Sequence, residues 1–365
     1  MKNKNVTILL LAAVVAALNV LIIINPALAL EAARRGGLLW FNSILPGILP
    51  FVIGANVLMS LGVVKFLGIF LSPVTKFLFK LPGASGFAIG MGAISGYPMG
   101  AKIVCQMRES GELTKNEAQR LLAFSNNAGP LFILGAVAVG MFGSAPLGYL
   151  LLLGHYIGAV SLGLITRMFT RKVPLKSDTL PVLVMDKQPF GQVLGQAVKA
   201  SMETLLVIGG FIILFSVVSA LITQFSFINP YMTIALASAL EMTGGLGLLS
   251  DHELSRHISA SAGVVLGFGG FSVMFQALNF IGKTDLSPAL YVASKLAHGI
   301  LAGVATFLIY PIFSSWIQTA TTPAFAPSIV RTFANSTAIF IIATLALITL
   351  GITALIIHKI KKQNK

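Results

Sequence analysis

Ten apolar segments divide the chain, and most of them approach the roughly 20 residues that a helix needs to cross a membrane. They cover residues 6–28, 38–61, 84–107, 119–142, 147–169, 204–224, 231–249, 258–281, 289–312 and 337–357. Hydrophobic residues make up 56% of the chain and charged residues only 10%. Such a chain cannot cover itself with polar surface, so lipid must be its solvent. We therefore expect an all-α polytopic membrane protein with about eight transmembrane helices and two re-entrant helical hairpins.

The stretch SGYPMGAK at residues 95–102 interrupts one of these segments. Pro98 has no N–H to donate, and the flanking glycines permit a sharp turn. A helical arm over 84–94 would be roughly 16 Å long, about half the hydrocarbon thickness. This pattern predicts a re-entrant hairpin over 84–107, whose tip must face a cavity because lipid cannot satisfy a freed backbone.

A second glycine-rich break, GVVLGFGGFSVMFQ at 263–276, predicts another hairpin over 258–281. The alternative for these small residues is close packing between helices. Ser95–Pro98 corresponds to Gly269–Ser272, 174 positions on, and Glu112–Thr114 corresponds to Asp285–Ser287, 173 positions on. These offsets predict two pseudo-symmetric halves, 1–169 and 191–365, joined by a cytoplasmic linker over 170–190. Duplicated halves with broken segments are typical of secondary transporters.

Lys102 would lie in the first turn of the helix that restarts after Pro98. A lysine there is unfavourable for the helix dipole, but it suits an anion bound at the tip. The alternative is that it pairs with a carboxylate or reaches the membrane interface. Gln276 takes the corresponding place in the second half.

Two further breaks carry polar residues. Ser125–Pro130 reads SNNAGP, and Glu241 begins the sequence EMTGG. Glu241 is a functional candidate because it is an ionisable group inside a membrane segment. We expect its partner to be Lys102, Lys295 or His298. A structural ion pair and coupling to protons or cations both remain open for Glu241. The predicted substrate-binding residues are Ser95, Gly96, Tyr97, Pro98, Gly100, Lys102, Asn126, Asn127, Glu241, Thr243, Gly269, Gly270, Phe271, Ser272 and Gln276.

Other classes of protein find little support. One cysteine excludes a disulfide framework, and no histidine spacing or catalytic motif indicates a metal, a cofactor or an enzyme. The net charge of +14 comes mostly from basic residues that flank apolar runs, which favours membrane topology and lipid headgroups over nucleic acid. Because basic residues favour the cytoplasmic side of a membrane, their distribution predicts that both termini are cytoplasmic. The segment 6–28 exceeds a signal-peptide core, so we expect an uncleaved first span, and 61–81 suits a helix in the interface.

The sequences SGYPMGAK, ELTKNEAQRLLAFSNNAGPLFILGAVAVG, EMTGG and GFGGFSV resemble the sporulation integral membrane proteins of the YlbJ type, also called SpoVV. The resemblance covers about residues 36–357. This group has nucleoside-recognition (Gate) domains and is distantly similar to concentrative nucleoside transporters. The resemblance implies transport of dipicolinic acid across the outer forespore membrane of an endospore-forming bacterium.

A planar dianion of this kind would suit helix N-termini and a cationic tip, and Tyr97 with Phe271 could sandwich its ring. Concentrative nucleoside carriers have inverted halves, whereas four apparent spans between the hairpins here would place both on one face. Whether the two hairpins enter from the same face or from opposite faces is left open. The sequence also leaves open whether the protein forms a homo-oligomer. The alternatives are a carrier of a nucleoside or another small solute, and a non-transporting assembly protein of the spore envelope.

Overall fold

The computed structural model describes residues 2–61, 71–168, 189–225 and 229–319, and every regular element in these ranges is a helix. This confirms the expected all-α class. The α-helices are α1 (Lys2–Ile24), α2 (Pro26–Leu39), α3 (Leu45–Ser60), α5 (Ser85–Ser95), α6 (Met99–Glu109), α7 (Lys115–Ser125), α8 (Ala145–Met168), α9 (Phe190–Thr223), α10 (Pro230–Leu240), α11 (Met242–Ser250), α12 (Arg256–Phe268), α13 (Gly270–Ile281) and α14 (Pro288–Thr319). Three π-helical segments are η1 (Trp40–Ile44), η2 (Thr75–Phe79) and η3 (Phe132–Met141).

Four segments of the described chain are long and apolar enough to cross a membrane: Ala145–Met168, Phe190–Thr223, Arg256–Ile281 and Pro288–Thr319. A fifth is obtained if Ala12–Ile24 and Pro26–Asn42, which are bent by 103°, count as one. We expected about eight transmembrane helices, and the described ranges contain fewer because several apolar segments are divided into shorter helices. The segment 337–357, most of the linker 170–190 and residues 62–70 lie outside the described residues.

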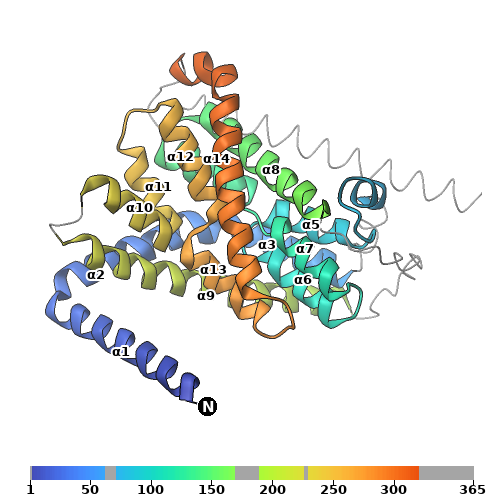
Figure 1. The fold of residues 1–365 in the computed structure, drawn as a ribbon, viewed down its shortest axis with the longest axis horizontal. Helices are drawn as coiled ribbons and strands as arrows, with labels where there is room; N and C mark the ends of the chain where they lie inside the picture. The colour runs from blue at the N-terminus through green and yellow to red at the C-terminus, as the bar shows by residue number, and fades with distance from the viewer. Residues whose placement is uncertain (1, 62–70, 169–188, 226–228, 320–365) are drawn as a thin grey trace, which may run out of the picture.

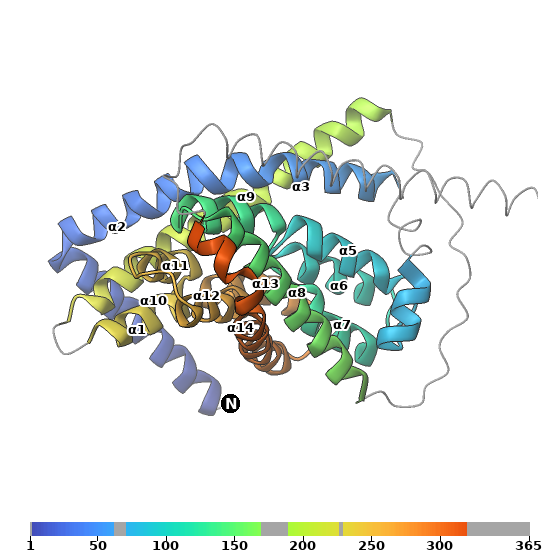
Figure 2. The ribbon, with the colours of Figure 1, turned by 90° about the horizontal axis from the view of Figure 1, so that it is seen from above.

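Two groups of long helices form the frame of the molecule. α2 and α3 pack along α9 on one side, and α8, α12 and α14 pack together beside them (Figures 1 and 2). Small residues bring the second group close. A Cβ added at Gly158 of α8 would lie 2.7 Å from the backbone nitrogen of Ala302 in α14. Helices in membranes commonly approach through such residues.

The first broken segment folds back on itself. α5 ends at Ser95, the next residue is Gly96 with a φ of 78° that favours glycine, and α6 begins after Pro98. Gly92 and Gly100, on opposite sides of the break, face one another and the backbone of α7. A Cβ would lie 1.8 Å from the Ser125 carbonyl oxygen if added at Gly92, and 2.2 Å from it if added at Gly100. These glycines therefore allow three helices to meet at one point.

The second broken segment differs from the expected hairpin over 258–281. Arg256–Ile281 runs as one segment across the break between α12 and α13, so this prediction is wrong. The chain reverses earlier, at Glu241, where Gly245 of α11 packs directly on Ser238 of α10. The two breaks also differ in backbone conformation: Glu241 is extended (φ −147°, ψ 119°), whereas Gly269 is left-handed (φ 83°).

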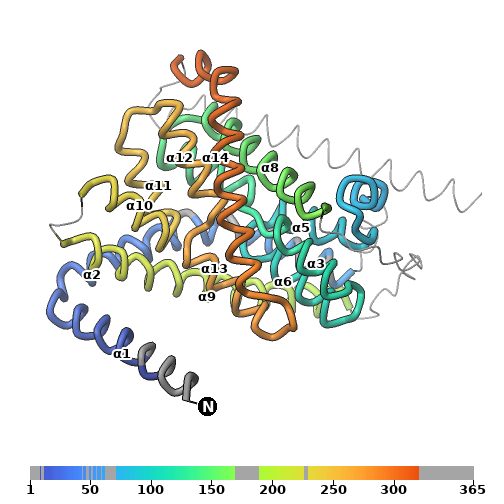
Figure 3. The backbone as a smooth tube through the Cα atoms, viewed as in Figure 1, coloured from blue at the N-terminus to red at the C-terminus, as the bar shows by residue number. Residues whose placement is uncertain are grey.

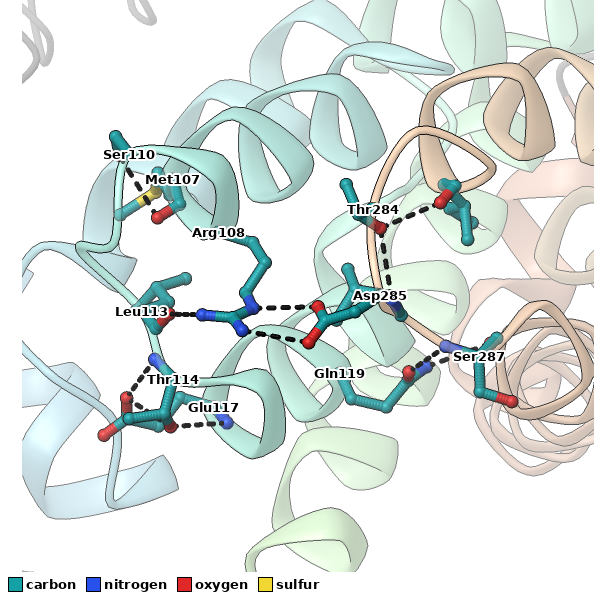
Figure 4. Close-up of polar contacts among 12 residues, drawn as sticks. Met107, Arg108, Ser110, Leu113, Thr114, Glu117, Gln119, Thr284, Asp285 and Ser287 are labelled. Atoms are coloured by element: carbon teal, nitrogen blue, oxygen red, sulfur yellow. Dashed lines mark hydrogen bonds and ion pairs between the residues drawn. The ribbon is translucent and has the colours of Figure 1, made fainter.

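The turns after α6 and α13 lie side by side and repeat one local design (Figure 4). The Thr114 hydroxyl accepts from the Glu117 N–H, and the Ser287 hydroxyl accepts from the Leu290 N–H. Each hydroxyl thus caps the N-terminus of the helix that follows it, by accepting from the N–H three residues further along. The predicted correspondence at offset 173 is therefore present in these turns, which lie on the same side of the molecule. The overall pseudo-symmetry of the halves stays a prediction.

Candidate functional site at the helix breaks

Several helix breaks meet around one partly open cavity. The path of the chain through these breaks can be followed in Figure 3. The cavity is lined by Ile44, Ile94, Ser95, Gly96, Tyr97, Ala128, Gly129, Leu131, Phe132, Ile208, Ile212, Glu241, Met242, Thr243, Ser272, Val273 and Gln276. Seven predicted residues are among them: Ser95, Gly96, Tyr97, Glu241, Thr243, Ser272 and Gln276. Segments far apart in the sequence thus contribute polar groups to one site.

Ser95 is the clearest sign that the cavity holds something polar. Its side chain is buried at the end of α5 and lines the cavity. The hydroxyl oxygen has no hydrogen-bond partner among the described residues. Since an unpaired buried hydroxyl costs free energy, water or a bound solute is expected beside it.

Glu241 lies at the reversal between α10 and α11 and is only 2% exposed. Its carboxylate accepts hydrogen bonds from the Thr243 hydroxyl and, at 2.8 Å, from the Gly244 N–H. It thereby caps α11, where negative charge is favourable. The expected pairing with Lys102, Lys295 or His298 is not among the ion pairs of the described residues. Glu241 thus faces the cavity as a helix cap.

A fully buried lysine lies next to the cavity. Lys295 of α14 donates hydrogen bonds to the Tyr97 hydroxyl at 2.9 Å and to the Asn126 carbonyl oxygen at 3.0 Å. Its third contact is His298 Nδ1, at 3.1 Å. Tyr97 contacts the Lys295 ammonium and also lines the cavity, so this side chain connects the two.

Asn126 completes the cluster. Its side-chain oxygen accepts from the Ala101 N–H in the first turn of α6, and its amide donates to the Tyr291 hydroxyl at 2.7 Å. One N–H that the α6 N-terminus could have offered to an anion is therefore already paired. Neighbouring Asn127 donates to the Phe124 carbonyl oxygen.

The remaining predicted residues do not line the cavity: Pro98, Gly100, Lys102, Asn126, Asn127, Gly269, Gly270 and Phe271. Lys102 is half-buried in α6 and interacts electrostatically with Glu203 of α9. Phe271 is 41% exposed and packs against Phe268, so it does not form the expected ring sandwich with Tyr97. Gly269 instead lies against the Tyr97 ring, where an added Cβ would be 3.5 Å from it.

Sequence reasoning named Lys295 and His298 only as partners for Glu241 and missed them as a centre of their own. The signal was available. A lysine and a histidine three positions apart share one helix face, and both lie in an apolar helix, where charged residues are rarely placed without a function.

Broken helices around a buried polar centre, together with the four or five apolar spans of the described residues, are typical of an integral membrane protein. The chain is 34% identical, over 351 residues, to the sporulation integral membrane protein YlbJ of Bacillus subtilis strain 168. The alignment covers 87% of this chain and 86% of that protein. The chain therefore belongs to the YlbJ family of sporulation integral membrane proteins, which confirms the resemblance. No protein-family profile and no solved structure matches it.

Proposed function

We propose that this protein is a carrier that moves dipicolinate, a small planar dicarboxylate, across the outer forespore membrane toward the spore. One observation carries the proposal: broken helices from both halves meet at a cavity that several polar side chains line, and the Lys295 ammonium lies beside it. Irregular backbone at membrane depth is tolerated where it lines a cavity, and carriers place their sites there. The choice of dipicolinate rests on the family resemblance.

The cavity has a volume of about 50 Å³, which is room for a few water molecules. An aromatic dicarboxylate needs more, so the proposal requires the α5–α6 break to move away from Glu241 during loading. Glu241 would repel a dianion. Transport of dipicolinate through this site therefore requires a proton on Glu241 when the solute is bound, which couples proton and solute movement.

A neutral solute such as a nucleoside is the second candidate. One feature of the cavity lining favours a neutral solute. The lining offers a carboxylate, two hydroxyls and an amide for hydrogen bonding, from Glu241, Thr243, Ser272 and Gln276. Lys295 favours the anion through its positive charge alone, since its N–H donors are already used by Tyr97, Asn126 and His298.

Uptake by the purified protein in liposomes tests the choice. Labelled dipicolinate should enter in a saturable manner, faster with an inward proton gradient, and excess unlabelled uridine should not compete. Empty liposomes and liposomes with an unrelated membrane protein are the controls. Saturable uptake of uridine alone would replace dipicolinate by a nucleoside. Absence of both fluxes from a folded protein would reject the carrier. A strain lacking the gene should form spores poor in dipicolinate while the mother cell retains it.

A further inference from the structure

Lys295 is fully buried in α14, yet none of its hydrogen-bond partners in the described part of the chain is a carboxylate. A buried charge without a counter-charge is costly unless other groups replace its hydration. Three acceptors do so here: the Tyr97 hydroxyl, the Asn126 carbonyl oxygen and His298 Nδ1, at 2.9, 3.0 and 3.1 Å.

The neighbours of these acceptors fix the direction of each hydrogen bond. Tyr97 donates its own proton to the Leu266 carbonyl oxygen at 3.0 Å, so it accepts from Lys295. His298 Nε2 lies 3.0 Å from the His155 carbonyl oxygen and must donate to it, so Nδ1 of the neutral ring accepts. The Asn126 carbonyl can only accept. With a neutral His298 ring, Lys295 therefore uses three N–H donors, which only the charged ammonium has.

We propose that this cluster is a monovalent-cation site that the protein fills with the tethered ammonium of Lys295 in place of a free ion. Carbonyl and hydroxyl oxygens that replace a hydration shell are how proteins hold free monovalent cations. The site joins the α5–α6 break, the 126–129 turn and α14. The resident cation thus holds three segments together without any ion from solution.

Removing the tether should expose the site to free cations. Lys295→Ala shortens the side chain and leaves the three acceptors in place. We expect the purified variant to melt at a lower temperature than wild type and to be restabilised by ethylammonium, ammonium or sodium chloride. Its Tm should rise with the logarithm of cation concentration, by roughly 5 °C at a hundredfold excess over Kd.

Two matched proteins separate this effect from general salt effects. Wild type holds its own ammonium, and Lys295→Met fills the same space without charge, so neither should respond to ethylammonium beyond the response to choline chloride. Equal responses in all three proteins, or none in a folded Lys295→Ala, would reduce Lys295 to a packing residue and overturn the proposal.

A second pair of variants tests the site with Lys295 present, in case Lys295→Ala does not fold. His298→Asn supplies an acceptor, whereas His298→Leu removes it at similar bulk. The asparagine variant should keep the higher Tm, and the reverse order would contradict a hydrogen-bonded ammonium. Because melting is measured without any transported solute, failure here is distinct from failure of dipicolinate transport.

Discussion

The Arg108 guanidinium faces the Asp285 carboxylate, and two parallel hydrogen bonds of 2.9 Å join them across the two halves of the chain (Figure 4). Beside them, the Gln119 amide donates to the Ser287 carbonyl oxygen and accepts from the Ser287 N–H. Such forked pairing fixes orientation as well as distance. These contacts hold the turns after α6 and α13 at the same side of the molecule.

Asp285→Asn should lower thermal stability slightly near neutral pH, because the pair is partly exposed and screened by solvent. Arg108 holds the pKa of Asp285 below its ordinary value of 3.8. The stabilisation is therefore present above the ordinary pKa and is lost as pH falls through the lowered one. Melting curves of wild type and variant should converge at low pH and at high salt. Asp251→Asn, at an exposed site, is the control, and a gap that persists at low pH would indicate a steric effect.

Gly92→Ala should destabilise the protein by about 1–3 kcal/mol or prevent folding, because overpacking forces backbone to shift. The added Cβ would lie 1.8 Å from the Ser125 carbonyl oxygen, which belongs to backbone and cannot swing away. Gly210→Ala in α9 is the control, since nothing lies within 4 Å of its added Cβ, and alanine favours the helix. Comparison of Tm in detergent tests this. A tolerated Gly92→Ala would contradict the close meeting of α5, α6 and α7.

Glu241→Gln should leave the protein inserted and folded, because the glutamine oxygen still accepts from the Gly244 N–H. If Glu241 couples solute movement to protons, the variant should abolish dipicolinate accumulation. Glu241→Ala loses the cap as well, which costs about 0.5–2 kcal/mol. Spore dipicolinate content, with membrane levels checked by immunoblot, tests the role. Full accumulation by Glu241→Gln would leave Glu241 as a helix cap alone.

Lys102→Met and Lys295→Met form a matched pair for the anion site. If Lys102 contacted the anion, its loss would reduce affinity on the order of 10- to 100-fold. Since Lys102 lies outside the cavity lining, we expect a change of less than about threefold. Lys295→Met should cause the larger loss, because Lys295 contacts Tyr97 of the lining. Uptake in liposomes at matched protein amounts measures both, and the opposite order would move the anion site to the first turn of α6.

The sequence alone could identify the broken positions, because glycine, proline and ionisable residues stand out inside apolar segments. Ser95, Gly96, Glu241 and Thr243 were found in this way and line one cavity. Apolar periodicity could not tell which break reverses the chain. Glu241 reverses it while Gly269 does not, and this depends on backbone conformation selected by packing.

The solvent, the helical class and the family membership are determined by the sequence itself, because apolar content and the pairing needs of the backbone leave few alternatives. The tertiary structure decided which polar residues meet. Lys102 and Lys295 look alike as lone lysines in apolar segments, but only Lys295 is fully buried among acceptors from other segments. Its partner Asn126 lies 169 positions away in the chain, and such contacts arise from helix packing that no local pattern records.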